Sequence, residues 1–253
     1  MTETQATTTP PPFSPDLKAG RVIAILGMHR SGTSLLAGTL QECGLDLGEV
    51  NTSAPANEKG NQESWLLTAL HEDLLREAGG GWDRPPERPV TWGPLHRAAR
   101  DLFIGLFKDR PVWGLKDPRL LFCLEGWLES LPHMELIGVF RHPLEVVRSL
   151  VQRTPARFTP DRALGLWAAY NRQLLACQKR TGCSLVEYGG EGLEFNERAA
   201  RLARRLALPR VPAATDLTFF EAGLRHQRVG DPPPPGEAAA LYARLRELAA
   251  EWD

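Results

Sequence analysis

The sequence lacks several features that would place a protein in a familiar class at once. It has no run of about 18 apolar residues, so no segment is predicted to span a membrane. It has little charge imbalance: the net charge of −1 argues against a nucleic-acid partner, because a nucleic-acid surface needs an excess of basic residues. Its four cysteines form no CxxC pair and no metal-ligand spacing. We therefore expect free thiols, no metal site and a reducing, cytoplasmic compartment.

The length and composition are those of a globular protein. The chain has 253 residues, 42% of them hydrophobic, which is enough for one large α/β domain with its own core. Residues 1–20 are rich in Thr and Pro and lack an apolar signal core, so we expect a disordered leader there. Residues 21–253 are then predicted to form a single α/β domain, whose portion from about residue 194 is helical.

Strand patterns alternate with helix patterns along this domain. Short apolar runs predict strands at Arg21–Gly27, Val112–Leu115, Glu135–Phe140 and Ser184–Tyr188. Apolar residues at helical spacing predict helices at Thr33–Cys43, Glu63–Ala78, Pro143–Gln152, Asp161–Arg180, Asn196–Leu206 and Glu237–Glu251. Such alternation predicts a P-loop-type three-layer α/β fold, with a central, mostly parallel sheet flanked by helices. The proline-rich segment Trp82–Pro94 is predicted to be irregular, either a lid over a site or a surface loop pinned by its tryptophans.

A glycine-containing turn joins the first predicted strand to the first predicted helix. The segment Gly27–Ser34 (GMHRSGTS) has the G-x-x-x-x-G spacing that lets backbone amides surround a phosphate at a helix N-terminus. A nucleotidase needs a lysine before the final hydroxyl residue, but Thr33 stands there, and Arg30 supplies a cation inside the turn. No apolar strand ends in a clear metal-binding aspartate. The turn therefore predicts an anion site that is not made for a triphosphate with Mg²⁺.

The RSGTS segment after an apolar strand resembles the 5′-phosphosulfate loop of the sulfotransferase superfamily, in its bacterial and tyrosylprotein-type branch. The resemblance implies that the donor is PAPS (3′-phosphoadenosine 5′-phosphosulfate) and that the product is adenosine 3′,5′-bisphosphate. It further implies that the 5′-phosphosulfate is held by Arg30, Ser31, Gly32, Thr33 and Ser34.

A second segment, Val139–Ser149 (VFRHPLEVVRS), is similar to the 3′-phosphate segment of this family. Arg141 ends a predicted strand, and Ser149 follows it by eight residues, as the family pattern requires. Pro143 suits a first helical turn, a helix N-terminus favours an anion, and a guanidinium can bind phosphate through two hydrogen bonds. For this segment alone, a salt bridge and a solvent-facing serine are the alternative.

Three further residues resemble family positions, and the resemblance as a whole covers approximately residues 21–188. Lys116 in KDPR resembles a lysine that contacts the transferring sulfuryl group. Tyr188 resembles a tyrosine beside the adenine, although this sequence has YGGEGL where the family has a shorter Y-E-x-L. Arg225 resembles a late phosphate contact. A surface cation is the alternative for both Lys116 and Arg225.

A hydroxyl acceptor must lose its proton as it attacks sulfur, so a general base is expected. The candidates are Glu63, Glu49, His71 and His29. The segment Asn57–Glu63 (NEKGNQE) resembles a bacterial sulfotransferase pattern, N-x-x-G-x-x-E, that places Glu63 near the site, although a glutamate there can instead stabilise the start of a helix. Glu49 lies at the distance from the loop at which the tyrosylprotein-type branch has its base.

The function predicted from the sequence is transfer of a sulfuryl group from PAPS to a hydroxyl acceptor, with Arg30 and Lys116 stabilising the charge that develops on the bridging oxygen. A small molecule, carbohydrate, lipid, natural product or peptide all remain possible acceptors. Two alternatives stay open. A P-loop kinase or NTPase would need Mg²⁺, whereas a non-catalytic nucleotide-binding module would show no turnover.

Overall fold

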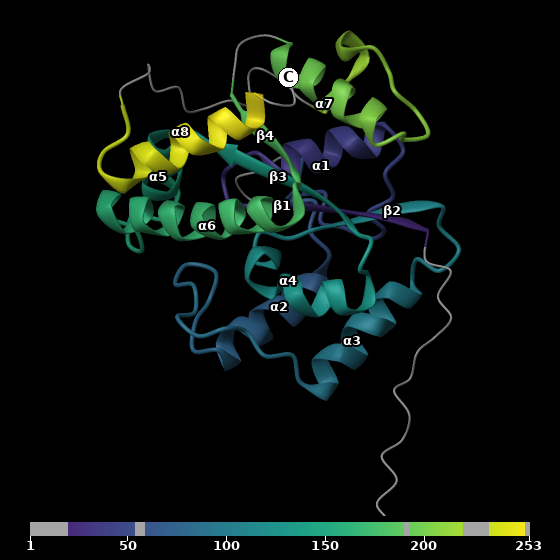
Figure 1. The fold of residues 1–253 in the computed structure, drawn as a ribbon, viewed down its shortest axis with the longest axis horizontal. Helices are drawn as coiled ribbons and strands as arrows, with labels where there is room; N and C mark the ends of the chain where they lie inside the picture. Colours follow the sequence, from purple (N-terminus) through teal and green to yellow (C-terminus); the bar gives the residue numbers. More distant parts are fainter. Residues whose placement is uncertain (1–19, 54–58, 190–192, 220–232, 251–253) are drawn as a thin grey trace, which may run out of the picture.

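The computed structural model describes residues 20–53, 59–189, 193–219 and 233–250. The predicted leader (apart from Gly20), Arg225 and Asn57 lie outside these ranges. No described helix is long and apolar enough to cross a membrane. The chain is arranged in layers about one sheet (Figure 1).

The sheet has four parallel strands in the order β2-β1-β3-β4. Their bounds are β1 Arg21–Gly27, β2 Val112–Lys116, β3 Glu135–Arg141 and β4 Ser184–Tyr188. In the register, Ile25 pairs with Lys116, and Arg141 pairs with Tyr188. The strands therefore end together, and the last residues of β2, β3 and β4 meet at one edge of the sheet, where β1 also ends. The predicted fold class is confirmed.

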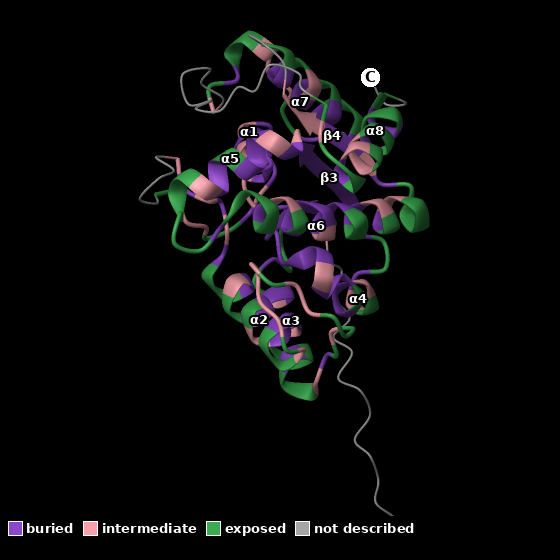
Figure 2. Ribbon diagram, turned by 90° about the vertical axis from the view of Figure 1, so that its left-hand side faces the viewer, coloured by how far each residue is buried: buried purple, intermediate pink, exposed green. Residues whose placement is uncertain are grey.

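Helices cover both faces of the sheet (Figures 1 and 2). One face packs against α1 (Thr33–Glu42) and α7 (Glu194–Arg205), and the other against α4 (Leu120–Ser130), α5 (Pro143–Arg153), α6 (Pro160–Thr181) and α8 (Glu237–Ala250). Successive residues of β1 face opposite sides: Ile25 belongs to the core under α1 and α7, and Leu26 to the core on the other side. Burial on both sides explains why these strands are continuous apolar runs rather than alternating ones.

Two helices of the structure were not among those predicted, namely α3 (Pro94–Gly105) and α4. Together with α2 (Trp65–Glu77), they form the lower part of the molecule in Figure 1. Pro94, which ends the predicted irregular segment, stands at the first position of α3, where its missing N–H costs nothing. Helix α2 begins at Trp65 with Ser64 as N-cap, so Glu63 lies just before the helix rather than in its first turn.

The cysteines and the tryptophan-bearing loop agree with the sequence. All four cysteines are free and buried. The loop between α2 and α3 is irregular, and Trp92 is buried against Trp127 of α4, with ring centroids 6.0 Å apart. Trp82 lies 4.7 Å from the ring of His29 in the Gly27–Ser34 turn. The loop is therefore pinned by both tryptophans, and one of them contacts the predicted phosphate loop.

Candidate functional site

The turn after β1 has the backbone conformation of an anion-binding loop. Arg30 and Gly32 both adopt positive φ, 68° and 91°, and the Ser31 amide donates to the carbonyl of Met28 at 3.2 Å. A Cβ atom on Gly32 would lie 2.5 Å from Cγ of Tyr188, so no larger residue fits there. Gly32 is also the N-cap of α1 and has no side chain with which to cap it. The first amides of α1 are therefore suited to an anion.

Ser31 provides an independent sign that an anion belongs in this loop. The residue is fully buried, and its hydroxyl oxygen has no hydrogen-bond partner among the described residues. A buried hydroxyl without a partner is costly unless a ligand or water completes it. Thr33 beside it is also buried. The loop thus fits the 5′-phosphosulfate end of PAPS, whose oxygens can accept from the hydroxyl and the amides.

The second predicted phosphate element lies directly against this loop. Nε of Arg30 donates to Oγ of Ser149 at 3.0 Å, and Nη1 of Arg141 donates to the carbonyl of Arg30 at 3.3 Å. Arg141 also binds Glu145 at 2.6 Å, and its guanidinium lies 4.8 Å from the ring centre of Tyr188. Residues from β1–α1, from β3–α5 and from the end of β4 thereby meet, as the sequence predicted.

The positive charge in this region is crowded. Burial lowers the pKa of Arg30 to about 10, and the nearby guanidiniums of Arg153 and Arg141 lower it further in the same direction. Burial also lowers the pKa of Arg153. Like charges gathered in a buried place disfavour one another, and an anion relieves this repulsion. Because Arg30 reaches Ser149, its side chain belongs to the predicted 3′-phosphate element as much as to the loop that carries it.

Lys116 occupies the opposite side of the loop. It ends β2 and is only 2% exposed, so it is not a surface cation. Its Nζ donates to Oε1 of Glu63 at 2.6 Å, to the carbonyl of Asn61 at 2.7 Å and to Oγ of Ser34 at 3.1 Å. A carboxylate, a cation and a loop hydroxyl are thus held together where the phosphate loop turns into α1.

Arg119 extends this cluster and was not singled out from the sequence, although it ends the same KDPR segment as Lys116. Its guanidinium lies 3.6 Å from Oε2 of Glu63 and 3.0 Å from Oδ1 of Asp117. Asp117 is fully buried, and burial alone would raise its pKa. The hydrogen bond and charge of His71 and the charge of Arg119 outweigh burial and hold the pKa of Asp117 below its ordinary value. The nearest carboxylate to the loop is therefore ionised and already engaged.

The candidate bases occupy three different environments. Glu63 contacts Lys116 and Arg119. His71 is fully buried behind Asp117: its Nε2 accepts from the indole N–H of Trp127 at 2.8 Å, and its Nδ1 lies 3.4 Å from Oδ2 of Asp117. Glu49 is exposed in the loop after α1 and has no hydrogen bond or ion pair within the described ranges. The structure thus brings Glu63 to the loop and does not bring His71 or Glu49 there.

His29, the fourth candidate, lies within the loop. Its Nε2 is buried and has no hydrogen-bond partner in the described part of the chain. Burial holds the pKa of His29 well below its ordinary value, and the charges of Arg119, Lys116 and Arg30 act in the same direction. The ring packs against Trp82 and, at 6.0 Å, against Tyr170. A neutral imidazole therefore lines the wall of the site that the loop of Trp82 covers.

Comparisons with known proteins reveal the fold but not a family. No protein-family model matches the chain, and no curated protein matches it in sequence. The sulfotransferase domain of the Synechococcus PCC 7002 olefin synthase superposes with a TM-score of 0.50 at 18% identity, over 94% of this chain and 97% of that one.

Two other solved structures are similar in part. The sulfotransferase domain from the Curacin biosynthetic pathway has a TM-score of 0.47 and 17% identity, over 92% of this chain and 90% of that one. The Mycobacterium tuberculosis sulfotransferase STF1 has a TM-score of 0.43 and 16% identity, over 65% of this chain and 60% of that one. At these identities, the likeness to the olefin synthase domain shows that the chain has the fold of a sulfotransferase domain.

Proposed function

We propose that this chain is a PAPS-dependent sulfotransferase that sulfates a hydroxyl acceptor and releases adenosine 3′,5′-bisphosphate. One observation carries the proposal: two cationic groups lie on opposite sides of a single phosphate loop. Lys116 with Ser34 stands on one side, and Arg141 with Ser149 on the other. A nucleotide with separate anionic groups at its 3′ and 5′ positions matches two such groups, whereas one triphosphate chain does not.

The donor would be held by residues of four elements. The 5′-phosphosulfate is assigned to the amides and side chains of Arg30, Ser31, Gly32, Thr33 and Ser34. Arg141 and Ser149 are assigned to the 3′-phosphate, because charge-assisted bonds from a guanidinium favour a dianion. Tyr188, which packs against Gly32 and Arg141, is assigned to the adenine. The arginine at position 30 also supports the bacterial and tyrosylprotein-type branch, since the cytosolic branch has lysine there.

PAPS supplies the sulfuryl group, and the remaining chemistry belongs to the side chains beside Ser34. Glu63 accepts the proton of the acceptor hydroxyl as its oxygen forms a bond to sulfur. The bond from sulfur to the bridging oxygen breaks, and the negative charge passes to the departing 5′-phosphate. Lys116, held 3.1 Å from Ser34, is placed to stabilise that charge. Arg119 holds the second oxygen of Glu63 and so orients the carboxylate.

Phosphoryl transfer with Mg²⁺ is less consistent with these residues. The loop has Thr33 in place of the lysine that reaches β- and γ-phosphates. Asp117, the carboxylate that follows β2, is fully buried between Arg119 and His71 and so offers no open oxygen to a metal ion. A binding module without activity would keep the loop, but it would not need a carboxylate and a lysine in contact beside it.

Thermal unfolding with nucleotides tests the proposed donor. PAPS and adenosine 3′,5′-bisphosphate should raise Tm without metal, because a ligand at a hundredfold excess over its Kd stabilises the folded state by about 2.7 kcal/mol. Adenosine 5′-phosphosulfate, which lacks the 3′-phosphate, should raise it much less. A larger increase with ATP and Mg²⁺ than with the bisphosphate would instead favour a kinase or NTPase. Untargeted mass spectrometry of cells with and without the gene would then identify the acceptor.

A further inference from the structure

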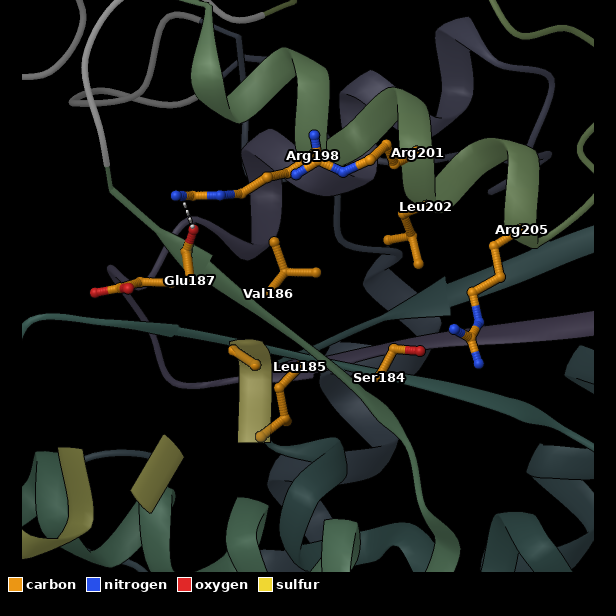
Figure 3. A pocket seen from close by; sticks show the side chains of 9 residues that line it. Ser184, Leu185, Val186, Glu187, Arg198, Arg201, Leu202 and Arg205 are labelled. Atoms are coloured by element: carbon orange, nitrogen blue, oxygen red, sulfur yellow. Dashed lines mark hydrogen bonds between the residues drawn. The ribbon is translucent and has the colours of Figure 1, made fainter. Parts of the chain in front are cut away.

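A basic groove lies along the outer edge of the sheet, away from the phosphate loop (Figure 3). It is a cavity of about 260 Å³ lined by four consecutive residues of β4, three arginines and Leu202 of α7, and Ala249 of α8. Successive side chains of a strand point to opposite faces of a sheet. A cavity that touches four in succession must therefore lie beside the backbone of the strand.

The backbone at this edge is available for pairing. β4 is the last strand of the sheet and pairs through one side only, with β3. No other described strand pairs with it. α7 and α8 pack on opposite faces of the sheet, so they form two walls with the edge of β4 between them. An exposed strand edge of this kind is a template for an additional strand.

The wall formed by α7 is basic. Arg198, Arg201 and Arg205 are spaced at i, i+3 and i+7, which places them along one side of the helix over about 10.5 Å. Arg198 donates to the carbonyl of Glu187 at 3.3 Å, near the end of β4, and Arg205 shares a second hollow with Ser184 at its start. The helix therefore runs antiparallel to β4, and its arginines follow the strand from one end to the other.

The acidic groups near the groove do not cancel this charge. Glu187 is held from α8 by the hydroxyl of Tyr242 and by Arg246 at 3.3 Å. Glu194 lies 3.8 Å from Arg198, at the end of the groove. Arg201 and Arg205 are exposed, so further carboxylates can reach them from outside.

From this arrangement we propose that the groove binds an acidic segment of a partner protein in extended conformation, added to the sheet beside β4. Its backbone pairs with the edge of β4. Acidic side chains at alternate positions, roughly 6.7 Å apart on one face of a strand, lie toward the arginines of α7. The intervening side chains face the apolar wall near Ala249. A simple anion would use the arginines but would leave the strand edge unpaired.

Three labelled peptides test both parts of the proposal on the unmodified full chain. The first is an acetylated peptide that alternates glutamate with threonine or valine, the second has glutamine for glutamate, and the third keeps glutamate but has N-methylated amides on the edge facing β4. Fluorescence anisotropy at low salt should show binding of the first, with Kd about tenfold higher or more for each of the others. Equal binding of the glutamine peptide would refute the role of the arginines. Equal binding of the N-methylated peptide would refute strand addition.

Two matched substitutions locate the site. Arg201→Glu should weaken the acidic peptide by about tenfold or more, whereas Arg204→Glu, an equal charge change at an exposed position of the same helix outside the groove, should leave Kd nearly unchanged. Arg205→Gln provides a milder variant if Arg201→Glu fails to fold by circular dichroism. Equal losses in the Arg201 and Arg204 variants would place the peptide elsewhere. Displacement of the peptide by a short oligonucleotide of equal charge would make the groove a general polyanion site and overturn the proposal.

The proposed groove is independent of the sulfuryl-transfer site. Arg201→Glu should therefore leave the Tm increase with adenosine 3′,5′-bisphosphate unchanged. If the bisphosphate fails to bind the unmodified chain while the peptide series behaves as expected, the donor assignment is wrong and the groove stands.

Discussion

Lys116 lies between a carboxylate, a hydroxyl and a carbonyl oxygen, and this triple contact gives the candidate site its reactive end. A buried ammonium is tolerated only where such partners compensate the loss of water. Glu63 is the one charged partner of the three, so the two side chains depend on each other for their positions. Substitutions must therefore separate loss of chemistry from loss of structure.

Glu63→Gln makes this separation at the proposed base. Glutamine keeps the size of the side chain and one hydrogen-bond acceptor for Lys116 but removes basicity. We expect turnover to fall by roughly 10²–10⁴-fold, the usual contribution of a general base, while the affinity for adenosine 3′,5′-bisphosphate stays nearly unchanged. Steady-state rates with any identified acceptor and calorimetric binding of the bisphosphate measure the two effects.

Glu49→Gln is the matched control, because Glu49 is an exposed glutamate in the preceding loop. It should leave both turnover and binding intact. If Glu49→Gln is inactive while Glu63→Gln keeps its rate, the role of base belongs to Glu49.

Arg141→Ala tests the 3′-phosphate assignment. Removing the guanidinium should weaken adenosine 3′,5′-bisphosphate by about tenfold or more, since a hydrogen bond to a charged group contributes about 1.5–3 kcal/mol. AMP, which has only a 3′-hydroxyl, should lose much less. Isothermal titration with both nucleotides decides the matter, and equal losses would remove Arg141 from the site.

At the scale of single elements, the phosphate loop is where sequence and structure agree most closely. An apolar run, glycines at fixed spacing and a following helical pattern are local signals, and they predicted β1, the turn and α1 with nearly the observed bounds. α4 was missed because its nearly continuous apolar sequence gives little helical periodicity and it starts four residues after β2 ends. The contact of Glu63 with Lys116 joins residues 53 apart in the sequence, and only the tertiary fold determines such a pair.

Gly32→Ala tests the geometry of the loop. The substitution forces a non-glycine residue to φ 91° and brings its Cβ to 2.5 Å from Tyr188. We expect a loss of about 1–3 kcal/mol in the free energy of unfolding, the range for strained backbone, and loss of bisphosphate binding. Gly105→Ala in α3, whose Cβ meets nothing within 4 Å, should instead stabilise the protein by about 0.5–1 kcal/mol. Urea unfolding and calorimetry measure both, and unaltered nucleotide affinity in Gly32→Ala would contradict the proposed loop function.

At the scale of the whole molecule, the strand order determines where the site lies. β1 stands between β2 and β3, so the loop that follows it is flanked by Lys116 on one side and Arg141 on the other. The chain reverses its direction of progress across the sheet between β2 and β3, and ligands of open α/β sheets bind at such a reversal, beyond the carboxyl ends of the strands. The sequence predicted the parallel sheet, but the separation of the two cationic groups follows from this strand order.

Acid should destabilise the whole protein through His29. The pKa of His29 is lowered well below 6.5 by burial and then by the charges of Arg119, Lys116 and Arg30, against the opposing charge of Asp117. Below pH 6.5 the unfolded chain therefore binds a proton that the folded chain does not, and the free energy of unfolding should fall as the pH falls, by up to about 1.4 kcal/mol per pH unit. Urea unfolding between about pH 7 and 5.5 measures this slope in the protein and in His29→Gln. The other histidines titrate in both proteins, and Asp117, whose lowered pKa costs stability only below about pH 4, does not contribute in this window. The slope should thus be smaller in His29→Gln, and parallel curves would mean that His29 is protonated as readily in the folded loop as in the unfolded chain.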